Sequence, residues 1–317
     1  IDTLPPVEGL TRALPADDAR ALEHLAREPE IAALATGRKR VMQLWDACAL
    51  PDYRRIAPVI LSHLKDRPLT LKRYPDGVEK DYFFEKRCPG HRPAWLKTAD
   101  LVRDGGERMT VCLVNDLETL IWVENLASLE LHVPLAKAVS PKTPDSIVFD
   151  LDPGEGANVL DCARVALILR GLLLEWRLAG FVKTSGRKGL HLYVPLNRKE
   201  ATFDETKRFS KAVAVVLEKN YPDLVTSRMA KEFRKGRVFI NWSQNDASKT
   251  MVSVYSLRAG EKPVVSFPLS WRELENASER GDPDKLRVLH SEAVRRAGKS
   301  GDLFRQVLTK KQRLPHP

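Results

Sequence analysis

The spacing of apolar residues changes along the chain. Before residue 65 it is helical, because apolar side chains recur every three or four positions after Pro15 and again after Pro51. From residue 69 the pattern shifts to short β-branched and aromatic runs bounded by Pro and Gly, which is typical of strands. This part predicts a helix over 117–127 and strands over 69–73, 81–86, 109–114 and 129–133.

Strands and helices alternate from residue 146 onward. An apolar run over 146–152 predicts a strand, and a helical pattern over 159–179 follows, with Asn158 as its N-cap and Gly180 as its end. Further elements are predicted as strands over 181–184, 190–196, 238–242 and 251–257, a helix over 204–219, and a last helical stretch from Asp282. This interleaving favours a mixed α/β or α+β architecture.

Composition is that of a folded, basic protein. At about 100–200 residues per domain, the 317 residues form one large domain or two closely joined ones. Apolar residues at 43% and charged residues at 30% exclude disordered, collagen-like and coiled-coil classes. Lys and Arg outnumber Asp and Glu by 52 to 42. We therefore expect a polyanionic partner, either nucleic acid or an anionic membrane surface.

Membrane insertion and secretion are not expected. The longest nearly uncharged stretch, 165–174, contains Arg170 and is far shorter than the roughly 20 apolar residues that span a bilayer. No signal-peptide pattern opens the chain, and its proline-rich ends and missing initial Met suggest a segment of a longer protein. The four cysteines are too scattered for a zinc site or a disulfide framework, so we expect a reducing, cytoplasmic location.

The sharpest chemical feature is Asp150-Leu-Asp152 at the end of a predicted strand. Because side chains alternate along a strand, both carboxylates point to one face. Two close carboxylates repel each other unless a cation lies between them, and Mg²⁺ or Mn²⁺ would suit oxygen ligands together with substrate phosphates. A strand end with two solvated acids is the alternative interpretation.

Two other segments carry polar side chains at predicted strand ends. Thr184-Ser-Gly-Arg-Lys-Gly-Leu-His191 is a strand-turn-strand element whose glycines would let backbone amides approach an anion, with Arg187 and Lys188 supplying charge. It lacks the spacing of a Walker loop, and a basic hairpin tip is the alternative. A third segment, residues 238–258, brings amides, hydroxyls and cations to the ends of two predicted strands, or is an ordinary polar loop.

Taken together, these segments resemble the polymerase domain of bacterial ATP-dependent DNA ligase D, in the archaeo-eukaryotic primase superfamily. The resemblance covers about residues 62–274 and lies in Arg67-Pro-Leu-Thr-Leu, Tyr74-Pro-Asp-Gly77, Phe83-Phe-Glu-Lys86, Glu130-Leu-His132, Phe149-Asp-Leu-Asp-Pro-Gly154, Thr184–His191, Trp242-Ser-Gln-Asn245 and Ser256-Leu-Arg258. It implies an α+β, primase-type fold with two β-sheets flanked by helices around a central catalytic cleft. We accordingly divide the chain into a helical, DNA-end-contacting region (1–65), a polymerase core (66–275) and a C-terminal helical segment (276–317).

The resemblance implies an enzyme that adds nucleotides, preferably ribonucleotides, at DNA breaks and gaps during bacterial non-homologous end joining. Asp150 and Asp152 would bridge two metal ions, Mn²⁺ or Mg²⁺. His132 would also lie near these ions, and either Phe83 or Phe84 would stack on the base. The full implied nucleotide-binding set is Lys72, Phe83, Phe84, His132, Ser185, Lys188, His191, Gln244 and Arg258. By strand alternation alone, at least one of the two phenylalanines is expected in the core.

Asn241 departs from the family pattern, which has a third acidic metal ligand at this position. An amide there offers a neutral oxygen, so we expect retained nucleotide binding with reduced or absent nucleotidyl transfer. Three explanations are open: a substitution made to trap a complex, natural divergence, or replacement of the missing carboxylate by Asp246. A replacement that keeps the size of the side chain is what a deliberate trap would use.

Partners follow from the resemblance as well. They are DNA with 5′-phosphorylated ends, gaps or overhangs, a nucleoside triphosphate, ligase and phosphoesterase domains of the same polypeptide, and a Ku-type end-binding protein. Candidates for gripping the 5′-phosphate, by charge alone, are Arg38, Lys39, Arg40, Arg54 and Arg55. Two rival functions are a non-catalytic end-binding module that senses nucleotide, which Asn241 favours, and a metal-dependent phosphodiesterase.

Overall fold

The computed structural model describes residues 49–102 and 105–315, with side chains described from Tyr53 onward. The first described element is helix α4, Ala49–Leu64, which matches the helical pattern predicted after Pro51. The N-terminal basic candidates Arg38, Lys39 and Arg40 lie outside the described residues.

A six-stranded sheet is built around strand β6. Its strand order is β14 (Pro268–Leu269), β7 (Phe181–Thr184), β8 (Leu190–Pro195), β6 (Ser146–Pro153), β10 (Val238–Asn241) and β9 (Val225–Thr226). Strand β6 runs antiparallel to β8 and to β10. Phe149 and Leu151 are fully buried on one face of β6, where Cys162 of helix α6 (Val159–Glu175) packs against the strand. Asp150 and Asp152 therefore occupy the other face.

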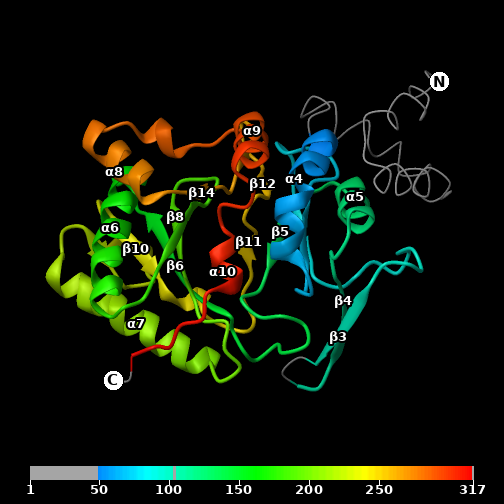
Figure 1. Ribbon diagram of the computed structural model, residues 1–317, viewed down its shortest axis with the longest axis horizontal. Helices are drawn as coiled ribbons and strands as arrows, with labels where there is room; N and C mark the ends of the chain where they lie inside the picture. Colours follow the sequence, from blue (N-terminus) through cyan, green and yellow to red (C-terminus); the bar gives the residue numbers. More distant parts are fainter. Residues whose placement is uncertain (1–48, 103–104, 316–317) are drawn as a thin grey trace.

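A four-stranded antiparallel sheet lies beside it (Figure 1). Its order is β11 (Met251–Val252), β5 (Ser128–Val133), β1 (Thr70–Arg73) and β2 (Phe83–Glu85), and helices α4 and α5 (Leu117–Asn125) pack along it. Strand β5 is one of the two interior strands of this sheet, and every one of its residues is buried. Two small hairpins complete the strands: β3 (Thr98–Val102) with β4 (Arg108–Cys112), and β12 (Leu257–Arg258) with β13 (Val264–Val265). The mixed architecture expected from the sequence is confirmed.

The remaining elements are helical. Helix α7, Phe203–Asn220, begins with a capping box between Thr202 and Glu205 and packs along β6 and β9. The predicted C-terminal helical stretch consists of a short 3₁₀ turn, Pro283–Leu286, followed by α9, His290–Ser300. Two helices were not predicted: α8, Trp271–Arg280, which lies against α6, and the short α10, Arg305–Thr309, which lies against β8.

Two predicted boundaries are wrong. Helix α6 starts at the expected N-cap, Asn158, but ends at Glu175, because Arg177 adopts a left-handed backbone with φ of 57° and closes the helix before Gly180 is reached. The strand predicted over 251–257 is interrupted after Val252. Tyr255 has φ of 66° and donates its N–H to Ser266 O at 2.7 Å, so the chain turns before β12 begins.

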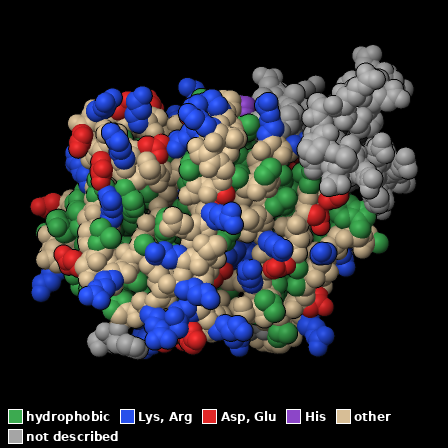
Figure 2. Space-filling model, in the orientation of Figure 1, with side chains coloured by type: hydrophobic (Ala, Val, Ile, Leu, Met, Phe, Trp, Pro, Cys, Tyr) green, Lys and Arg blue, Asp and Glu red, His purple; other side chains and the backbone are tan. Residues whose placement is uncertain are grey.

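Basic side chains are spread over the visible surface. In the face shown in Figure 2, Lys and Arg side chains extend across the centre and the lower edge, with acidic side chains between them. The net charge of the chain is +10. Within the residues that the structure describes, no helix has the length and apolar character needed to cross a membrane.

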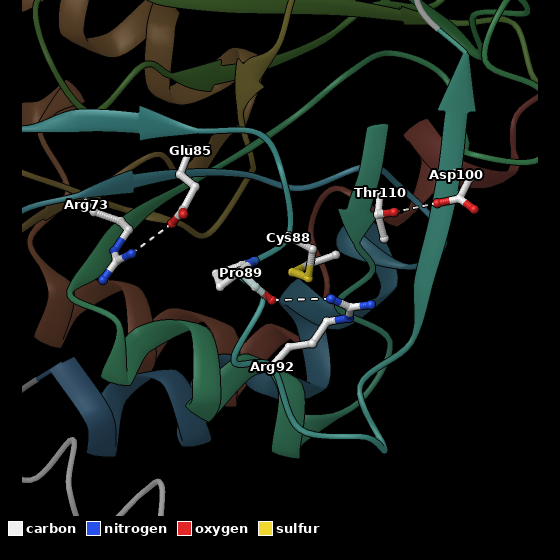
Figure 3. The surroundings of a disulfide bond; sticks show 8 residues. Arg73, Glu85, Cys88, Pro89, Arg92, Asp100 and Thr110 are labelled. Atoms are coloured by element: carbon white, nitrogen blue, oxygen red, sulfur yellow. Dashed lines mark hydrogen bonds and ion pairs between the residues drawn. A yellow bond between two sulfur atoms is a disulfide. The ribbon is translucent and has the colours of Figure 1, made fainter. Parts of the chain in front are cut away.

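The prediction that the cysteines form no disulfide is contradicted. Cys88, which follows β2, is bonded to Cys112 at the end of β4, and their Cα atoms lie 5.0 Å apart (Figure 3). The Cys88 N–H donates to Thr110 O at 2.8 Å, which aligns the two segments. The two cysteines are 24 residues apart in the sequence, and this spacing does not indicate that the segment after β2 lies beside β4. Cys162 is a buried free thiol.

Candidate active site

A row of polar side chains crosses four strands of the six-stranded sheet. In the strand register Asn241 of β10 lies opposite Asp150 of β6, Asp150 lies opposite His191 of β8, and His191 lies opposite Lys183 of β7. Directly opposed residues of antiparallel strands point to the same face, so the four side chains form one continuous row. Asp152 is two residues from Asp150 and shares that face.

Hydrogen bonds converge on the Asp150 carboxylate. Asn241 Nδ2 donates to Oδ2 at 3.2 Å, and Gln244 Nε2 approaches the same oxygen at 3.4 Å. His191 Nε2 is 3.3 Å from Oδ1. Asp150 is 6% exposed, so these contacts replace most of its hydration. The structure thus brings together four predicted site residues, Asp150, Gln244, His191 and Asn241.

The two carboxylates are electrostatically suited to a cation. Burial raises the pKa of Asp150, and burial together with the negative charge of Asp150 raises the pKa of Asp152. Both shifts mean that the doubly ionised pair is unstable without positive charge beside it. A divalent ion with oxygen ligands would remove that cost, so these two residues fit the expected metal.

No third carboxylate lies beside Asp150 and Asp152 in a metal-binding cluster among the described residues. Among them, no three His, Cys, Asp or Glu side chains cluster in a way that could hold a metal ion. Asp246, the possible replacement, instead accepts from Lys207 Nζ at 2.6 Å and from Ser248, contacts that lower its pKa to about 2. Asn241 Oδ1 accepts from Ser243 Oγ at 2.7 Å. The geometry therefore gives no support to compensation by Asp246.

Lys183 was not predicted as a site residue. Its ammonium group is fully buried and lies 3.0 Å from His191 Nδ1, 2.5 Å from Ser266 Oγ and 3.2 Å from Val252 O. Burial lowers the pKa of Lys183 well below its ordinary value. The contact with Val252, a residue of β11, also ties the six-stranded sheet to the four-stranded one. Its position two residues before Ser185, which directly follows the strand, could have indicated that it faces the site.

The predicted glycine-rich turn is present between β7 and β8. Ser185 Oγ accepts from the N–H groups of Arg187 and Gly189, both at 3.2 Å, and so holds the turn together. Gly186 has φ of 71°, and a Cβ atom there would lie 2.4 Å from Arg258 Cγ. A Cβ atom at Gly189 would lie 2.1 Å from the carbonyl oxygen of Leu151, so this glycine lets the turn approach the end of β6. Lys188 is exposed at the tip of the turn.

A second cluster lies on the four-stranded sheet, around Glu130. Three predicted nucleotide-binding residues contact its carboxylate: Lys72 at 3.2 Å, His132 at 3.1 Å and Arg258 at 2.9 Å. Glu130 was recognised as part of a motif but not as a site residue. Glu130 lies between Leu129 and Leu131, and the sequence gives no sign that basic side chains from other segments surround its carboxylate.

The two phenylalanines of β2 point to opposite faces. Phe84 lies opposite Lys72 in the register and places its ring edge-on, 5.7 Å from His132, whereas Phe83 lies opposite Arg73. Both side chains are exposed, Phe83 by 45% and Phe84 by 53%. The prediction that one of them belongs to the core is therefore wrong. Strand β2 is an edge strand of three residues, and the described part of the chain leaves both phenylalanine side chains largely accessible.

Of the basic candidates for a DNA end, two are described. Arg54 and Arg55 are neighbours on α4, where Arg55 is exposed and Arg54 is half-buried. Helical geometry turns neighbouring side chains about 100° apart, so these two point in different directions. Their role in binding DNA stays a prediction.

Comparison with known proteins identifies related chains. The family model of the LigD primase-polymerase domain matches residues 50–304. A multifunctional non-homologous end joining DNA repair protein, LigD of Mycobacterium tuberculosis, is 39% identical over 263 residues, which cover 80% of this chain and 34% of that protein. The bifunctional non-homologous end joining protein LigD of Bacillus subtilis is 32% identical over 222 residues, 70% of this chain and 35% of that protein.

A solved structure is similar as well. The polymerase domain of Mycobacterium tuberculosis ligase D in complex with DNA superposes with a TM-score of 0.77 at 36% sequence identity, covering 86% of this chain and 96% of that chain. The chain thus spans about a third of the length of its curated relatives and nearly all of the isolated polymerase domain. From the match of the family model, the sequence identities and the shared structure, we conclude that the chain belongs to the LigD primase-polymerase domain family.

Proposed function

We propose that this domain adds nucleotides, preferably ribonucleotides, to DNA ends and gaps during bacterial non-homologous end joining. One observation carries the proposal. Asp150 and Asp152, two acids suited to binding a metal ion, lie at the end of β6 beside the glycine-rich turn. Gly189 of this turn lies directly against Leu151, the residue between the two acids. Acids that attract divalent cations and a turn suited to phosphates are the two parts that phosphoryl transfer requires.

In this proposal Asp150 and Asp152 hold Mg²⁺ or Mn²⁺, with Asn241 at the third position. When bound, the ions supply positive charge to the transferring phosphoryl group and lower the pKa of the attacking hydroxyl. Lys72, Lys188 and Arg258 bind the triphosphate oxygens, Ser185 and His191 orient them, and Gln244 holds Asp150 in place. Phe84 stacks on the base, a contact that tolerates all four bases.

Asn241 is expected to impair this activity. Its amide donates to Asp150, whereas a carboxylate at the same place would share a cation with it. Nucleotide binding depends mainly on groups elsewhere in the site. We therefore propose that the chain retains nucleotide binding while its nucleotidyl transfer is weak. The DNA is proposed to carry a 5′-phosphate at the break, bound by basic residues near the N-terminus. The ligase and phosphoesterase domains and a Ku-type protein are the proposed partners.

A test of this function uses DNA with a 5′-phosphorylated gap, a labelled nucleoside triphosphate and Mn²⁺. Metal-dependent extension of the primer supports the proposal, and Asp150→Ala should abolish it. Binding of the triphosphate without extension in either the chain or its Asn241→Asp variant would contradict the proposed activity. That result would support the second candidate, a nucleotide-sensing module at DNA ends, which Asn241 favours. Shortening of the primer would indicate a phosphodiesterase instead.

A further inference from the structure

Glu130 is a fully buried carboxylate at the meeting point of the two larger sheets. Its side chain has 0% exposure, yet six donor groups surround it. Oε1 accepts from Tyr74 Oη at 2.6 Å, Lys72 Nζ at 3.2 Å, Arg187 Nη2 at 3.3 Å and the Ala259 N–H at 3.3 Å. Oε2 is approached by Arg258 Nη1 at 2.9 Å and His132 Nε2 at 3.1 Å.

These donors come from separate parts of the fold. Lys72 and Tyr74 belong to β1 and its end, and His132 belongs to β5. Arg187 comes from the turn between β7 and β8, and Arg258 comes from β12. One carboxylate thus fixes side chains from the four-stranded sheet, the six-stranded sheet and a small hairpin relative to one another.

The carboxylate has no capacity left for a ligand. An ionised carboxylate offers about four lone-pair positions, and six donors already compete for them. The surrounding hydrogen bonds and positive charges hold the pKa of Glu130 below its usual range despite burial, so the group is ionised. Whatever Glu130 contributes to binding must therefore pass through the side chains that it holds.

Two of these side chains acquire a defined orientation. Lys72 is held between Glu130 and the ring of Tyr82, whose centroid lies 3.8 Å from Nζ. His132 directs Nε2 at Glu130, and burial lowers the pKa of its imidazole. A neutral imidazole that donates from Nε2 keeps a lone pair on Nδ1, which makes that atom an acceptor for a hydroxyl group.

We infer that Glu130 is the positioning residue of the nucleotide site: it holds Lys72 and Arg258 apart and aimed at the phosphates, and it fixes His132 as an acceptor for a sugar hydroxyl. The identity of the ligand rests on the proposed function. Without Glu130 the lysine and the two arginines would repel one another and lose their common anchor.

A positioning role predicts a change in triphosphate affinity that is opposite to the change expected from charge alone. If Glu130 merely added negative charge near the site, removing that charge would tighten binding of an anionic triphosphate. A positioning role predicts the opposite, namely that Glu130→Gln weakens binding although the site becomes more positive. We expect the dissociation constant for ATP to rise by about tenfold or more, because charge-assisted hydrogen bonds that orient the cations are lost.

The experiment measures binding of a fluorescent ATP analogue in the presence of Mn²⁺, by titration of the complete chain. The variants are Glu130→Gln and Glu130→Asp. The latter keeps the charge but withdraws the carboxylate by one methylene group. Glu124→Gln, at a buried carboxylate in α5, is the matched control, and its dissociation constant should stay within about twofold of the original, since none of the donor groups that surround Glu130 comes from α5. Circular dichroism and the melting temperature report whether each variant is folded.

Weaker binding by folded Glu130→Gln supports the inference, and equal or tighter binding overturns it. If Glu130→Gln does not fold, Glu130→Asp decides: weaker binding at unchanged charge supports positioning, and unchanged binding contradicts it. A second readout is the ratio of affinities for ATP and 2′-deoxy-ATP, which should move towards one in Glu130→Gln if His132 loses its orientation.

Failure of this inference is distinguishable from failure of the proposed function. If the original chain binds ATP and extends the primer, and Glu130→Gln binds ATP equally well, only the inference about Glu130 is contradicted. Binding by the original chain that depends on Glu130, without extension even in the Asn241→Asp variant, would uphold the inference and contradict nucleotidyl transfer. A chain that binds no ATP in the presence of Mn²⁺ would overturn both.

Discussion

Asn241 lies directly opposite Asp150 in the pairing of β10 with β6, and its Nδ2 donates to Asp150 Oδ2 across 3.2 Å. The uncharged amide thus forms a hydrogen bond with Asp150 and adds no negative charge beside it. An aspartate here would face Asp150 with like charge, and the two would be stable together only with a cation between them.

The Asn241→Asp variant should therefore gain activity. We expect primer extension in Mn²⁺ to rise by at least about tenfold, since even residues that only orient metal ligands change activity by about 10–100-fold. The measurement is the rate of incorporation on gapped DNA. Asn220→Asp, the same chemical change at the exposed end of α7, should leave the rate unaltered. Equal rates for the original chain and Asn241→Asp would refute the impairment.

Stability without metal should depend on pH through Asp152. Its raised pKa means that the folded protein keeps a proton that the unfolded chain releases, so folding stability falls as pH rises from about 4 towards neutrality. Asp152→Asn has no such proton to lose.

The melting temperature of Asp152→Asn relative to the original chain should accordingly increase between pH 5 and pH 8, by about 2–4 °C for each 1 kcal/mol of linkage. Mn²⁺ at pH 8 should stabilise the original chain more than the variant. A difference in melting temperature that is constant with pH would show that Asp152 has an ordinary pKa.

The two exposed phenylalanines of β2 should differ in effect. Phe84 shares a face with Lys72 and contacts His132, whereas Phe83 is on the side of Arg73. Phe84→Ala should weaken nucleotide binding by about 1–3 kcal/mol, the usual value of one base–aromatic stack. Phe83→Ala is the matched control, of equal size and similar exposure. Titration with labelled ATP compares them, and a larger loss for Phe83→Ala would contradict the assignment.

The disulfide between Cys88 and Cys112 should be detectable chemically. In denaturant, a thiol reagent should find two more thiols after reduction than before it. Replacing both cysteines by alanine should lower the free energy of unfolding by about 3.5 kcal/mol, the loop-closure entropy for a ring of this length. Urea denaturation measures that loss. Cys162→Ala, at the buried free thiol, should leave the difference in thiol count intact, and an unchanged count on reduction would disprove the bond.

The sequence predicted the strands of the site more accurately than their surroundings. The strand carrying Asp150 and Asp152 has a continuous apolar run, and the N-cap Asn158 marks the following helix, so local signals are strong there. The end of that helix was misplaced because Arg177 adopts a left-handed conformation that favours glycine, a choice that depends on tertiary packing.

Residues that act through long-range contacts could not be found in this way. Lys183 and Glu130 are charged residues in otherwise apolar strands, and each also contacts a residue of the other sheet or of its turn, Val252 for Lys183 and Arg187 for Glu130, which local patterns cannot reveal. The same holds for Cys88 and Cys112, which pair because β4 runs alongside the segment after β2. Local periodicity shows which face a side chain occupies, but not what lies across from it.

The row from Asn241 to Lys183 makes the site sensitive to changes in chain length. Side chains of a strand point alternately to its two faces. Inserting or deleting one residue within β6, β8 or β10 would therefore turn the polar side chain that this strand contributes to the row into the core. The apolar neighbours, such as Leu151, would be turned outward at the same time. Substitution can therefore vary the chemistry of this sheet one position at a time, whereas the lengths of its central strands are constrained by the row of side chains that they carry.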